Sequence, residues 1–412
     1  MHKLKLIGPF AQAVTMDNLP VKGPLSDDRL EIIDHAGILV NGEMIEAIGA
    51  FRELKSLTLK IEPVEGDFVV LPGMIDVHTH LCWSGSRAKD YAMRLSGSSY
   101  LEIARQGGGI WSTVTKTREV GMEELAGLTA LHANRLLHQG TTTVEVKSGY
   151  GLNADSERKI LNAIRKANEI TKNDLIPTCL AAHIKPKDFE GSAREYLNYL
   201  IQDLLPGIKA EKLSHRVDIY VDEGAFNIQD ALYYLNAAKA LGFDVVVHAD
   251  QFKPGGAQLA VEVGALSADH LEASSDEDIA LLARSKVIPV ALPGASLGLG
   301  AGFAPARKLL NTGAPLVIAS DWNPGSAPMG NLLMQAAILG IYEKLTMAET
   351  LAAITCRAAS ALRLTDRGVL KPGMLADFIA FPCGDYREIL YNQGGMGPEI
   401  IWKRGRLVTG KR

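Results

Sequence analysis

Residues 217–250 have the sequence VDIYVDEGAFNIQDALYYLNAAKALGFDVVVHAD, which contains one complete strand–helix–strand unit. Two short runs rich in β-branched residues, 217–221 and 244–247, flank a longer amphipathic run at 228–241. A unit of this kind joins parallel strands, because the helix carries the chain back along the sheet. The stretch therefore predicts a parallel sheet that is covered by helices.

The same pattern recurs through the middle of the chain. Eight apolar runs are predicted as strands: 68–77, 141–146, 176–182, 217–221, 244–247, 266–268, 287–292 and 316–320. Helical patterns lie between them, among others at 155–170, 193–204, 228–241 and 276–285. Eight units predict an α/β fold, a (β/α)8 TIM-like barrel. An open doubly wound sheet is the alternative, but it would normally carry a nucleotide-binding loop, and none is found.

The two ends of the chain have a different pattern. Residues 1–65 and 366–412 contain short strands and turns, and Asn41-Gly42 is typical of a β-hairpin. We expect both ends to form one small β-sandwich domain, with the barrel of residues 66–365 inserted between them. The glycine-rich stretch 294–302 is predicted to be a mobile lid over the barrel mouth.

The composition excludes several classes of protein. A net charge of -4 argues against a nucleic acid partner, since phosphate binding needs clustered Lys and Arg. No run approaches the roughly 20 uncharged apolar residues that cross a bilayer, so no membrane span is expected. Gly8 and Pro9 interrupt the N-terminal apolar run too early for a secretion signal. Four cysteines without a CxxC pair are typical of the reducing cytoplasm.

Titratable side chains follow the predicted strands at their C-terminal ends, where barrel enzymes carry their active sites. Five of the ten histidines lie there: His78, His80, His183, His248 and His270. Side chains alternate along a strand, so His78 and His80 point the same way and can bind one metal ion together. Five histidines that converge on one rim predict a metal site.

The inferred metal ligands are His78, His80, His248 and Asp321. Three neutral imidazoles and one carboxylate suit Zn(II) or Fe(II) and leave a position for water. A divalent metal there would activate water and polarise a carbonyl, which predicts a hydrolase. Cys82 lies beside the histidine pair and could be a thiolate ligand, although a small packed residue is the preferred interpretation.

A second metal ion would need a bridging carboxylate or a carbamylated lysine. Glu145 and Lys147 are expected to lie on alternate faces of the second barrel strand, so that only one of them points inward. His183 could then also be a ligand. We prefer one metal ion, which leaves His183 free for the substrate.

Several stretches together resemble a known family. They are PGMIDVHTHL at 72–81, GSR at 85–87, YLEI at 100–103, GGGI at 107–110, TKTR at 115–118, VEVKSGYG at 144–151, HAD at 248–250, SADHL at 267–271 and DWNPGS at 321–326. On these motifs the chain resembles the amidohydrolase superfamily and, within it, the imidazolonepropionase family of histidine degradation. The resemblance covers nearly the whole chain, and the GGG and KSGYG motifs are its most particular parts.

The resemblance implies that a metal-dependent, homodimeric enzyme hydrolyses the cyclic amide C–N bond of 4-imidazolone-5-propanoate to N-formimino-L-glutamate. Asp321 would take a proton from the attacking water and pass it to the leaving nitrogen, while His270 acts as a base or as a donor to the oxyanion. Either residue can be the principal base. The resemblance also places these residues around the substrate: Arg87, Tyr100, Tyr150, His183, Gln251, Asn323, Gly325 and Ser326.

The side chains expected around the substrate distinguish a member of the imidazolonepropionase family from the alternative functions. The guanidinium fork of Arg87 suits the propanoate carboxylate, and Gln251 can both donate to and accept from ring nitrogens. A paralogous cyclic amidase or deaminase that acts on a related nitrogen heterocycle would keep the metal but would need no carboxylate clamp. A non-catalytic binding barrel would have little reason to keep four ligands and His270.

Overall fold

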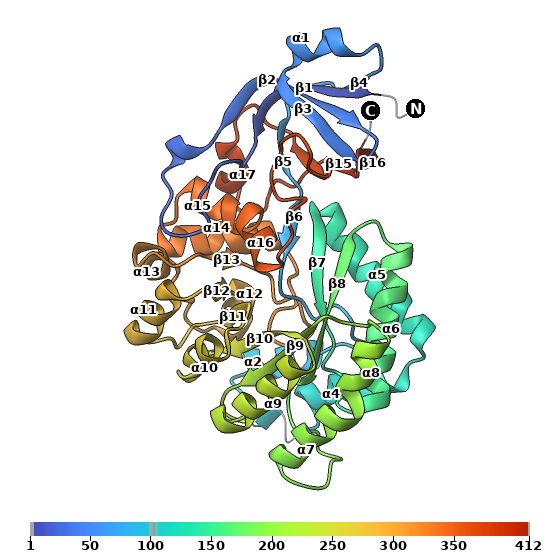
Figure 1. Cartoon of the computed structure of the whole chain (residues 1–412), viewed down its shortest axis with the longest axis vertical. Helices are drawn as coiled ribbons and strands as arrows, with labels where there is room; N and C mark the ends of the chain where they lie inside the picture. The colour runs from blue at the N-terminus through green and yellow to red at the C-terminus, as the bar shows by residue number, and fades with distance from the viewer. Residues whose placement is uncertain (1–3, 99–101, 104–105, 411–412) are drawn as a thin grey trace.

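The structure, a computed structural model, describes residues 4–98, 102–103 and 106–410. Eight parallel strands follow one another around a barrel in chain order (Figure 1). They are β6 (Met74–Asp76), β7 (Thr141–Lys147), β8 (Asp174–Ala182), β9 (Arg216–Val221), β10 (Asp244–Ala249), β11 (Ser267–His270), β12 (Ile288–Ala291) and β13 (Val317–Ile318). The backbone N–H of Asp321 donates to the carbonyl of His78 at 3.0 Å, so the chain after β13 meets the chain after β6. The barrel prediction is confirmed.

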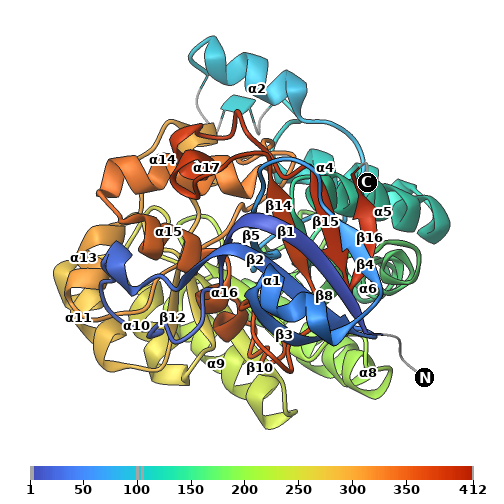
Figure 2. The same cartoon turned by 90° about the horizontal axis from the view of Figure 1, so that it is seen from above.

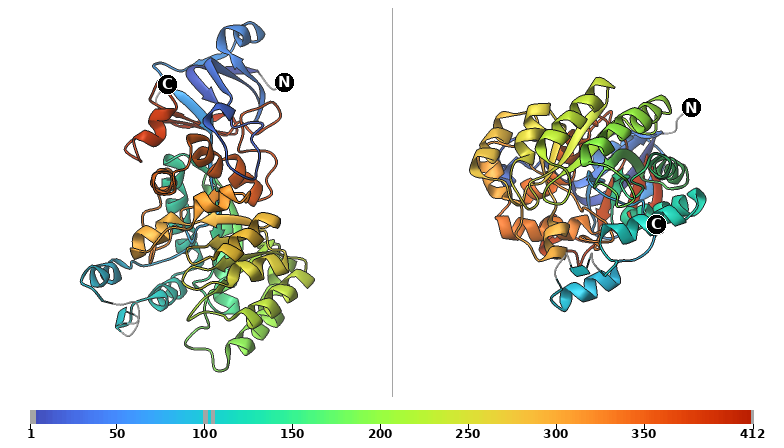
Figure 3. Two further views of the ribbon diagram at one scale, coloured as in Figure 1. Left: turned by 90° about the vertical axis from the view of Figure 1, so that its left-hand side faces the viewer. Right: turned by 90° about the horizontal axis from the view of Figure 1, so that it is seen from below.

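Helices surround the barrel strands, as the view from below shows (Figure 3). Their apolar faces pack inward: in α9, for example, Ala231, Tyr234, Leu235 and Ala238 are buried at helical spacing. The helices are α2 (Ala88–Leu95), α4 (Ile110–Glu119), α5 (Met122–His138), α6 (Ala154–Ile170), α7 (Ala193–Tyr199), α8 (Leu205–Ala210), α9 (Ile228–Ala240), α10 (Gly256–Val263), α11 (Asp276–Arg284), α12 (Pro293–Leu299), α13 (Ala306–Asn311), α14 (Leu332–Glu343), α15 (Met347–Ala353) and α16 (Cys356–Ala361). None of the helices in the described ranges is long and apolar enough to cross a membrane.

Strands from both ends of the chain form a separate mixed sheet above the barrel (Figures 1 and 2). The rings of Phe10, Phe378 and Trp402 pack against one another in its core. Asn41 pairs with Met44 in the predicted hairpin. The strands are β1 (Lys5–Val14), β2 (Ile32–Asn41), β3 (Met44–Ala50), β4 (Ile61–Pro63), β5 (Val69–Pro72), β14 (Phe378–Phe381), β15 (Ile400–Lys403) and β16 (Arg406–Thr409), and two short helices, α1 (Phe51–Leu54) and α17 (Arg387–Tyr391), accompany them.

The run predicted as a single strand at 68–77 is two strands in different sheets. β5 pairs with β1 and β14 of the terminal sheet, whereas β6 pairs with β7 of the barrel. Gly73 separates them, and a Cβ at this position would lie 2.3 Å from Oγ1 of Thr142. The chain can pass from one sheet to the other here only because glycine has no side chain.

The prediction of a mobile lid at 294–302 is wrong for most of that stretch. Residues 293–299 form α12, in which Gly294, Ala295 and Ser296 are buried. A Cβ at Gly294 would lie 2.4 Å from the carbonyl oxygen of Ser320, and one at Gly298 would lie 1.6 Å from that of Ser326. The glycines therefore allow α12 to pack closely against the loop after β13. From the sequence alone, glycines that allow close packing cannot be distinguished from glycines that make a loop flexible.

An ionic cluster joins the terminal sheet to the base of the barrel. Asp174, at the start of β8, lies 2.8 Å from Nζ of Lys403 and 3.0 Å from Nη2 of Arg404, and it also pairs with Arg367. Although partial burial opposes it, these cations lower the pKa of Asp174 to about 2. The carboxylate therefore stays ionised at neutral pH and stabilises the contact.

Candidate metal centre and active site

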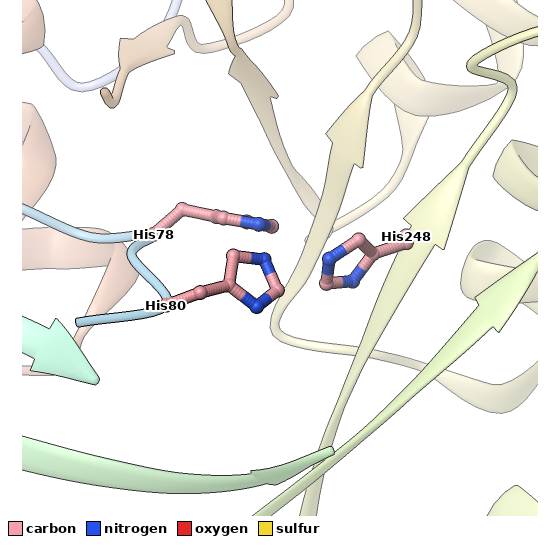
Figure 4. A group of neighbouring side chains, drawn as sticks. All are labelled: His78, His80 and His248. Atoms are coloured by element: carbon pink, nitrogen blue, oxygen red, sulfur yellow. The ribbon is translucent and has the colours of Figure 1, made fainter. Parts of the chain in front are cut away.

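Three histidines converge at the C-terminal rim of the barrel. His78 and His80 follow β6, His248 lies in β10, and the three rings face one another (Figure 4). One ligand atom from each lies within 4.8 Å of the others, and all three side chains are buried. The alternation of side chains along a strand places His78 and His80 on the same side of the chain.

Asp321 lies against the same cluster. Its Oδ1 is 3.5 Å from Nε2 of His78 and 3.3 Å from Nε2 of His80. Ligands that each lie roughly 2.1 Å from one tetrahedral zinc ion are about 3.4 Å apart. Asp321 has a backbone φ of 52°, in the left-handed region, and such strain is common where a side chain must be aimed at a site.

The chemistry of the cluster fits a divalent metal ion. Nε2 of His78 and Nε2 of His248 are buried and have no hydrogen-bond partner among the described residues. Burial lowers the pKa of His248 from 6.5 to about 4 and also lowers the pKa of His78 well below its ordinary value. Both imidazoles are therefore neutral at pH 7, as metal ligands must be, and a bound cation would satisfy the two nitrogen atoms.

Two buried carboxylates contact the Nδ1 atoms of His78 and His248. Asp269 Oδ2 lies 2.7 Å from Nδ1 of His78, and Asp218 Oδ2 lies 2.9 Å from Nδ1 of His248. Carboxylates in this position fix the ring orientation and leave the other ring nitrogen for a metal. Sequence patterns do not reveal the role of Asp269 or that of Asp218, which is recognisable only as an acidic residue in an otherwise apolar strand.

The expectation that Glu145 and Lys147 lie on alternate faces is wrong. The two residues are two positions apart in β7, so their side chains share one face, and Nζ of Lys147 lies 2.8 Å from Oε1 of Glu145. Both point into the barrel and are buried. Lys147 is thus paired with carboxylates below the histidine cluster.

His270, at the end of β11, lies next to the ligand histidines. Its ring centroid is 5.4 Å from that of His248, and its Nδ1 lies 3.5 Å from Oε2 of Glu272. Burial alone would lower the pKa of His270, but Glu272 and Asp321 raise it above its ordinary value. A protonated imidazole at this place can donate a proton. Glu272, which sequence reasoning missed, also accepts a hydrogen bond from Ser296 of α12 at 3.3 Å.

His183 and Tyr150 form the wall beside His80. The ring of His183 stacks on that of His80 with centroids 5.3 Å apart, and the ring of Tyr150 lies 5.7 Å from His183. The carbonyl of Gly149 lies 3.1 Å from Nδ1 of His183, which orients the ring. The group of ligand atoms that lie within 4.8 Å of one another contains His78, His80 and His248 but neither His183 nor Asp321, and of these two only Asp321 has an oxygen within 3.5 Å of a ligand nitrogen.

Gln251 lies on the loop after β10, where Oε1 accepts a hydrogen bond from the hydroxyl of Tyr220 at 2.9 Å. Tyr220 also packs its ring 5.8 Å from that of His248 and 6.1 Å from that of His183. It belongs to the same wall and was missed by the sequence analysis, since an aromatic residue in a strand is more often part of the core.

Asn323, Gly325 and Ser326 form a tight loop next to Asp321. Asn323 Nδ2 donates to Oδ2 of Asp321 at 3.0 Å, and its Oδ1 accepts from the backbone N–H groups of Gly325 and Ser326 at 2.8 Å each. The side chain of Asn323 therefore organises the loop and orients the carboxylate of Asp321.

Arg87 is buried at the edge of this loop. A Cβ at Gly325 would lie 2.9 Å from Nη1 of Arg87, so the absence of a side chain makes room for the guanidinium. Arg87 Nε donates to Asp90, whose carboxylate also accepts from the N–H of Gly109 at 2.8 Å. Gly109 of the GGG motif thus helps to hold Asp90, which in turn holds Arg87. Tyr100 lies outside the described residues.

Cys82 is not brought into the cluster. Its Sγ lies 3.8 Å from the carbonyl of Ile160, and burial raises the pKa of the thiol to about 12. Cys82 is not among the described residues whose ligand atoms lie close enough together to hold a metal ion. The interpretation as a small packed residue agrees with this position.

A (β/α)8 barrel with a histidine cluster at its C-terminal rim is typical of metal-dependent hydrolases. Comparison with known proteins supports this assignment. The model of the amidohydrolase family matches residues 69–408, and the chain belongs to this family. Its relatives include the imidazolonepropionase of Alkaliphilus oremlandii, 39% identical over 399 residues that cover 95% of this chain and 94% of that protein. The imidazolonepropionase of Bacillus cytotoxicus is 38% identical over 410 residues, which cover 98% of this chain and 96% of that protein. The chain is thus an enzyme of the class that hydrolyses C–N bonds, and the resemblance seen in the motifs is confirmed.

Solved structures share the fold at lower identity. A triazine hydrolase variant superposes with a TM-score of 0.75 at 17% identity and covers 99% of this chain and 95% of that chain. An adenosine deaminase from Xanthomonas campestris with bound zinc has a TM-score of 0.68 at 19% identity, covering 100% and 93%. Both likenesses concern the fold alone.

Proposed function

We propose that the chain hydrolyses the ring C–N bond of 4-imidazolone-5-propanoate and releases N-formimino-L-glutamate. The observation that carries this proposal is the similarity, over about the whole chain, to relatives named imidazolonepropionase. The rim supports it, because it combines a histidine cluster with a buried arginine that can bind a carboxylate.

His78, His80, His248 and Asp321 are the proposed ligands of one divalent metal ion, either Zn(II) or Fe(II). When bound, the metal supplies Lewis acidity that activates water and polarises a carbonyl. Imidazole and carboxylate ligands suit both ions, so metal analysis must distinguish them.

Asp321 and His270 are the proposed proton carriers. Although burial opposes it, His80 and the neighbouring histidines lower the pKa of Asp321, which keeps this carboxylate ionised and able to accept a proton from the attacking water. His270, whose pKa is raised, donates toward the developing oxyanion or the leaving nitrogen. An ionised Asp321 can accept a proton and a protonated His270 can donate one, which favours Asp321 as the base and His270 as the acid.

The substrate is proposed to lie between two walls. Arg87 would bind the propanoate carboxylate, while Tyr150, His183 and Gln251 contact the ring from the opposite side. Asn323, Gly325 and Ser326 would border the ring next to Asp321, and Tyr100 would complete the carboxylate pocket.

Turnover of enzymatically generated 4-imidazolone-5-propanoate by metal-quantified protein tests the proposal. We expect loss of the imidazolone absorbance, appearance of formiminoglutamate and about one metal ion per chain. An Asp321→Asn variant is the control for catalysis at this site. Absence of turnover at full metal occupancy would remove the named substrate, and hydantoin-like and amino-substituted rings would then be screened for the paralogous activity.

We also propose a homodimer in the cytoplasm. Four free cysteines, at positions 82, 179, 356 and 383, suit a reducing compartment. Sedimentation of the purified protein at several concentrations tests the dimer.

A further inference from the structure

Lys147 lies at the centre of a buried cluster of carboxylates inside the barrel. Its Nζ is 2.8 Å from Oε1 of Glu145, 3.0 Å from Oδ2 of Asp218 and 3.9 Å from Oδ2 of Asp269. The side chain of Lys147 is only 1% exposed, and each carboxylate is at most 2% exposed. A lysine so completely buried is rare, and it needs partners that offset the loss of hydration.

Two of these carboxylates are the ones that contact the ligand histidines. Asp218 Oδ2 lies 2.9 Å from Nδ1 of His248, and Asp269 Oδ2 lies 2.7 Å from Nδ1 of His78. In both cases the oxygen that faces the imidazole also faces the ammonium group of Lys147. One side chain therefore connects the supports of two histidines that come from different strands.

We infer that Lys147 is a positioning residue for the metal centre: its ammonium group fixes the carboxylates of Asp218 and Asp269, and these fix the rings of His248 and His78. The inference rests on the proposed metal site and does not depend on the substrate. On this inference Lys147 pairs with carboxylates and does not act as a carbamylated ligand that bridges two metal ions. Burial alone would lower the pKa of Lys147, but Asp218 and Glu145 raise it, so the amine remains an ammonium group.

Two physical effects of removing this charge have opposite signs. A buried cation near a metal site repels the metal, so its removal by itself should strengthen metal binding. If Lys147 acts by holding the carboxylates, its removal should weaken binding, because the supports of the two histidines would move. Loss of a single supporting group typically weakens metal affinity 10- to 100-fold.

The test is the affinity of the full-length Lys147→Met variant, first freed of metal, for Zn(II), measured by competition with a chromophoric chelator. We expect a roughly 10- to 100-fold loss of affinity and a changed visible spectrum of the Co(II)-substituted protein. Neither measurement uses a substrate, so failure of the proposed activity leaves the result interpretable. Zn(II) affinity equal to or above that of the wild type in folded K147M would overturn the inference.

Two further variants control for charge and folding. Arg216→Met removes a second buried cation that acts on Glu145 and Asp269 through its charge but forms no ion pair with either of them, and its Nη2 donates instead to the carbonyl of Leu362. This variant should leave Zn(II) affinity unchanged or slightly higher. If K147M does not fold, K147M/E145Q takes its place, because this pair removes one positive and one negative charge together. The same loss of affinity in the double variant supports the inference, and wild-type affinity overturns it.

Discussion

The carboxylate of Glu157 accepts a hydrogen bond from the backbone N–H of Gly151 at 2.7 Å. Glu157 lies in α6 and is fully buried, and the same carboxylate also accepts from the N–H groups of Gly149 and Leu152 at 3.1 and 2.8 Å. These bonds fix the loop that carries Tyr150 to the barrel mouth. A residue remote from the metal ligands thus shapes the wall of the proposed substrate site.

Replacement of Glu157 by alanine should leave three buried N–H groups without acceptors and loosen this loop. We expect KM to rise at least 10-fold and the free energy of unfolding to fall by at least about 3 kcal/mol, since each of the three buried N–H groups left without an acceptor costs about 1–3 kcal/mol. Glu157→Gln, which keeps one acceptor oxygen, should recover part of both losses. Steady-state kinetics and urea denaturation measure them.

Glu195→Gln is the matched control for this prediction. Glu195 also accepts a backbone N–H, that of Ser192 at 2.7 Å, but it lies on the exposed start of α7. The Glu195→Gln substitution should therefore leave KM unchanged. If E157A has a wild-type KM, the loop does not depend on Glu157.

Replacement of Arg87 by methionine should remove the proposed carboxylate clamp. A substrate with a propanoate group should lose about 10²-fold or more in kcat/KM, because two charge-assisted bonds are lost, whereas a neutral ring substrate should lose little. Kinetics with both kinds of substrate test this, and Lys89→Met, at an exposed position of α2, which begins directly after Arg87, is the control. Equal losses with charged and neutral rings would contradict the assignment of Arg87.

Removal of metal by a chelator should abolish hydrolysis and lower the melting temperature. The reason is that the buried imidazoles of His78 and His248 would lose the partner that satisfies their Nε2 atoms. Activity after addition of Zn(II) or of Fe(II) under anaerobic conditions would identify the functional metal. Activity that persists in fully metal-free protein would exclude the proposed mechanism.

Protonation of His248 should destabilise the metal-free protein as the pH falls from about 6.5 toward 4. Burial lowers the pKa of His248 from 6.5 to about 4, so the unfolded chain binds a proton in this range that the folded chain does not. The contribution of each such histidine to stability therefore rises with pH, by up to roughly 1.4 kcal/mol per pH unit. His78 and His183, whose pKa values burial also lowers, act in the same direction. Asp76 and Asp269, whose pKa values burial raises to about 7, act in the opposite direction, so the comparison with a His248 variant isolates the histidine effect.

Urea denaturation of chelator-treated protein at pH 7, 6 and 5 measures this slope. His248→Asn removes one of the titrating groups and should reduce the slope. A slope that is the same in wild type and H248N would show that His248 is not held neutral by burial.

Local pattern was sufficient to predict the barrel and most of its rim. Strand–helix repeats predict the (β/α)8 fold, and the period of two in a strand places His78 and His80 together, because both properties depend on residues close in sequence. The C-terminal strand ends of a barrel meet at one rim, so His248 and Asp321 could be predicted to join them.

Contacts between side chains of different strands and helices were decided only by the tertiary structure. Asp218, Asp269 and Lys147 come from three strands, and their pairing depends on the register between those strands, which no local pattern contains. The same holds for α12, where the glycines that suggest a mobile loop in the sequence instead allow contact with the loop after β13. Local sequence determines periodicity and residue chemistry, whereas the partners of a buried charge and the space beside a glycine depend on segments that are distant in the chain.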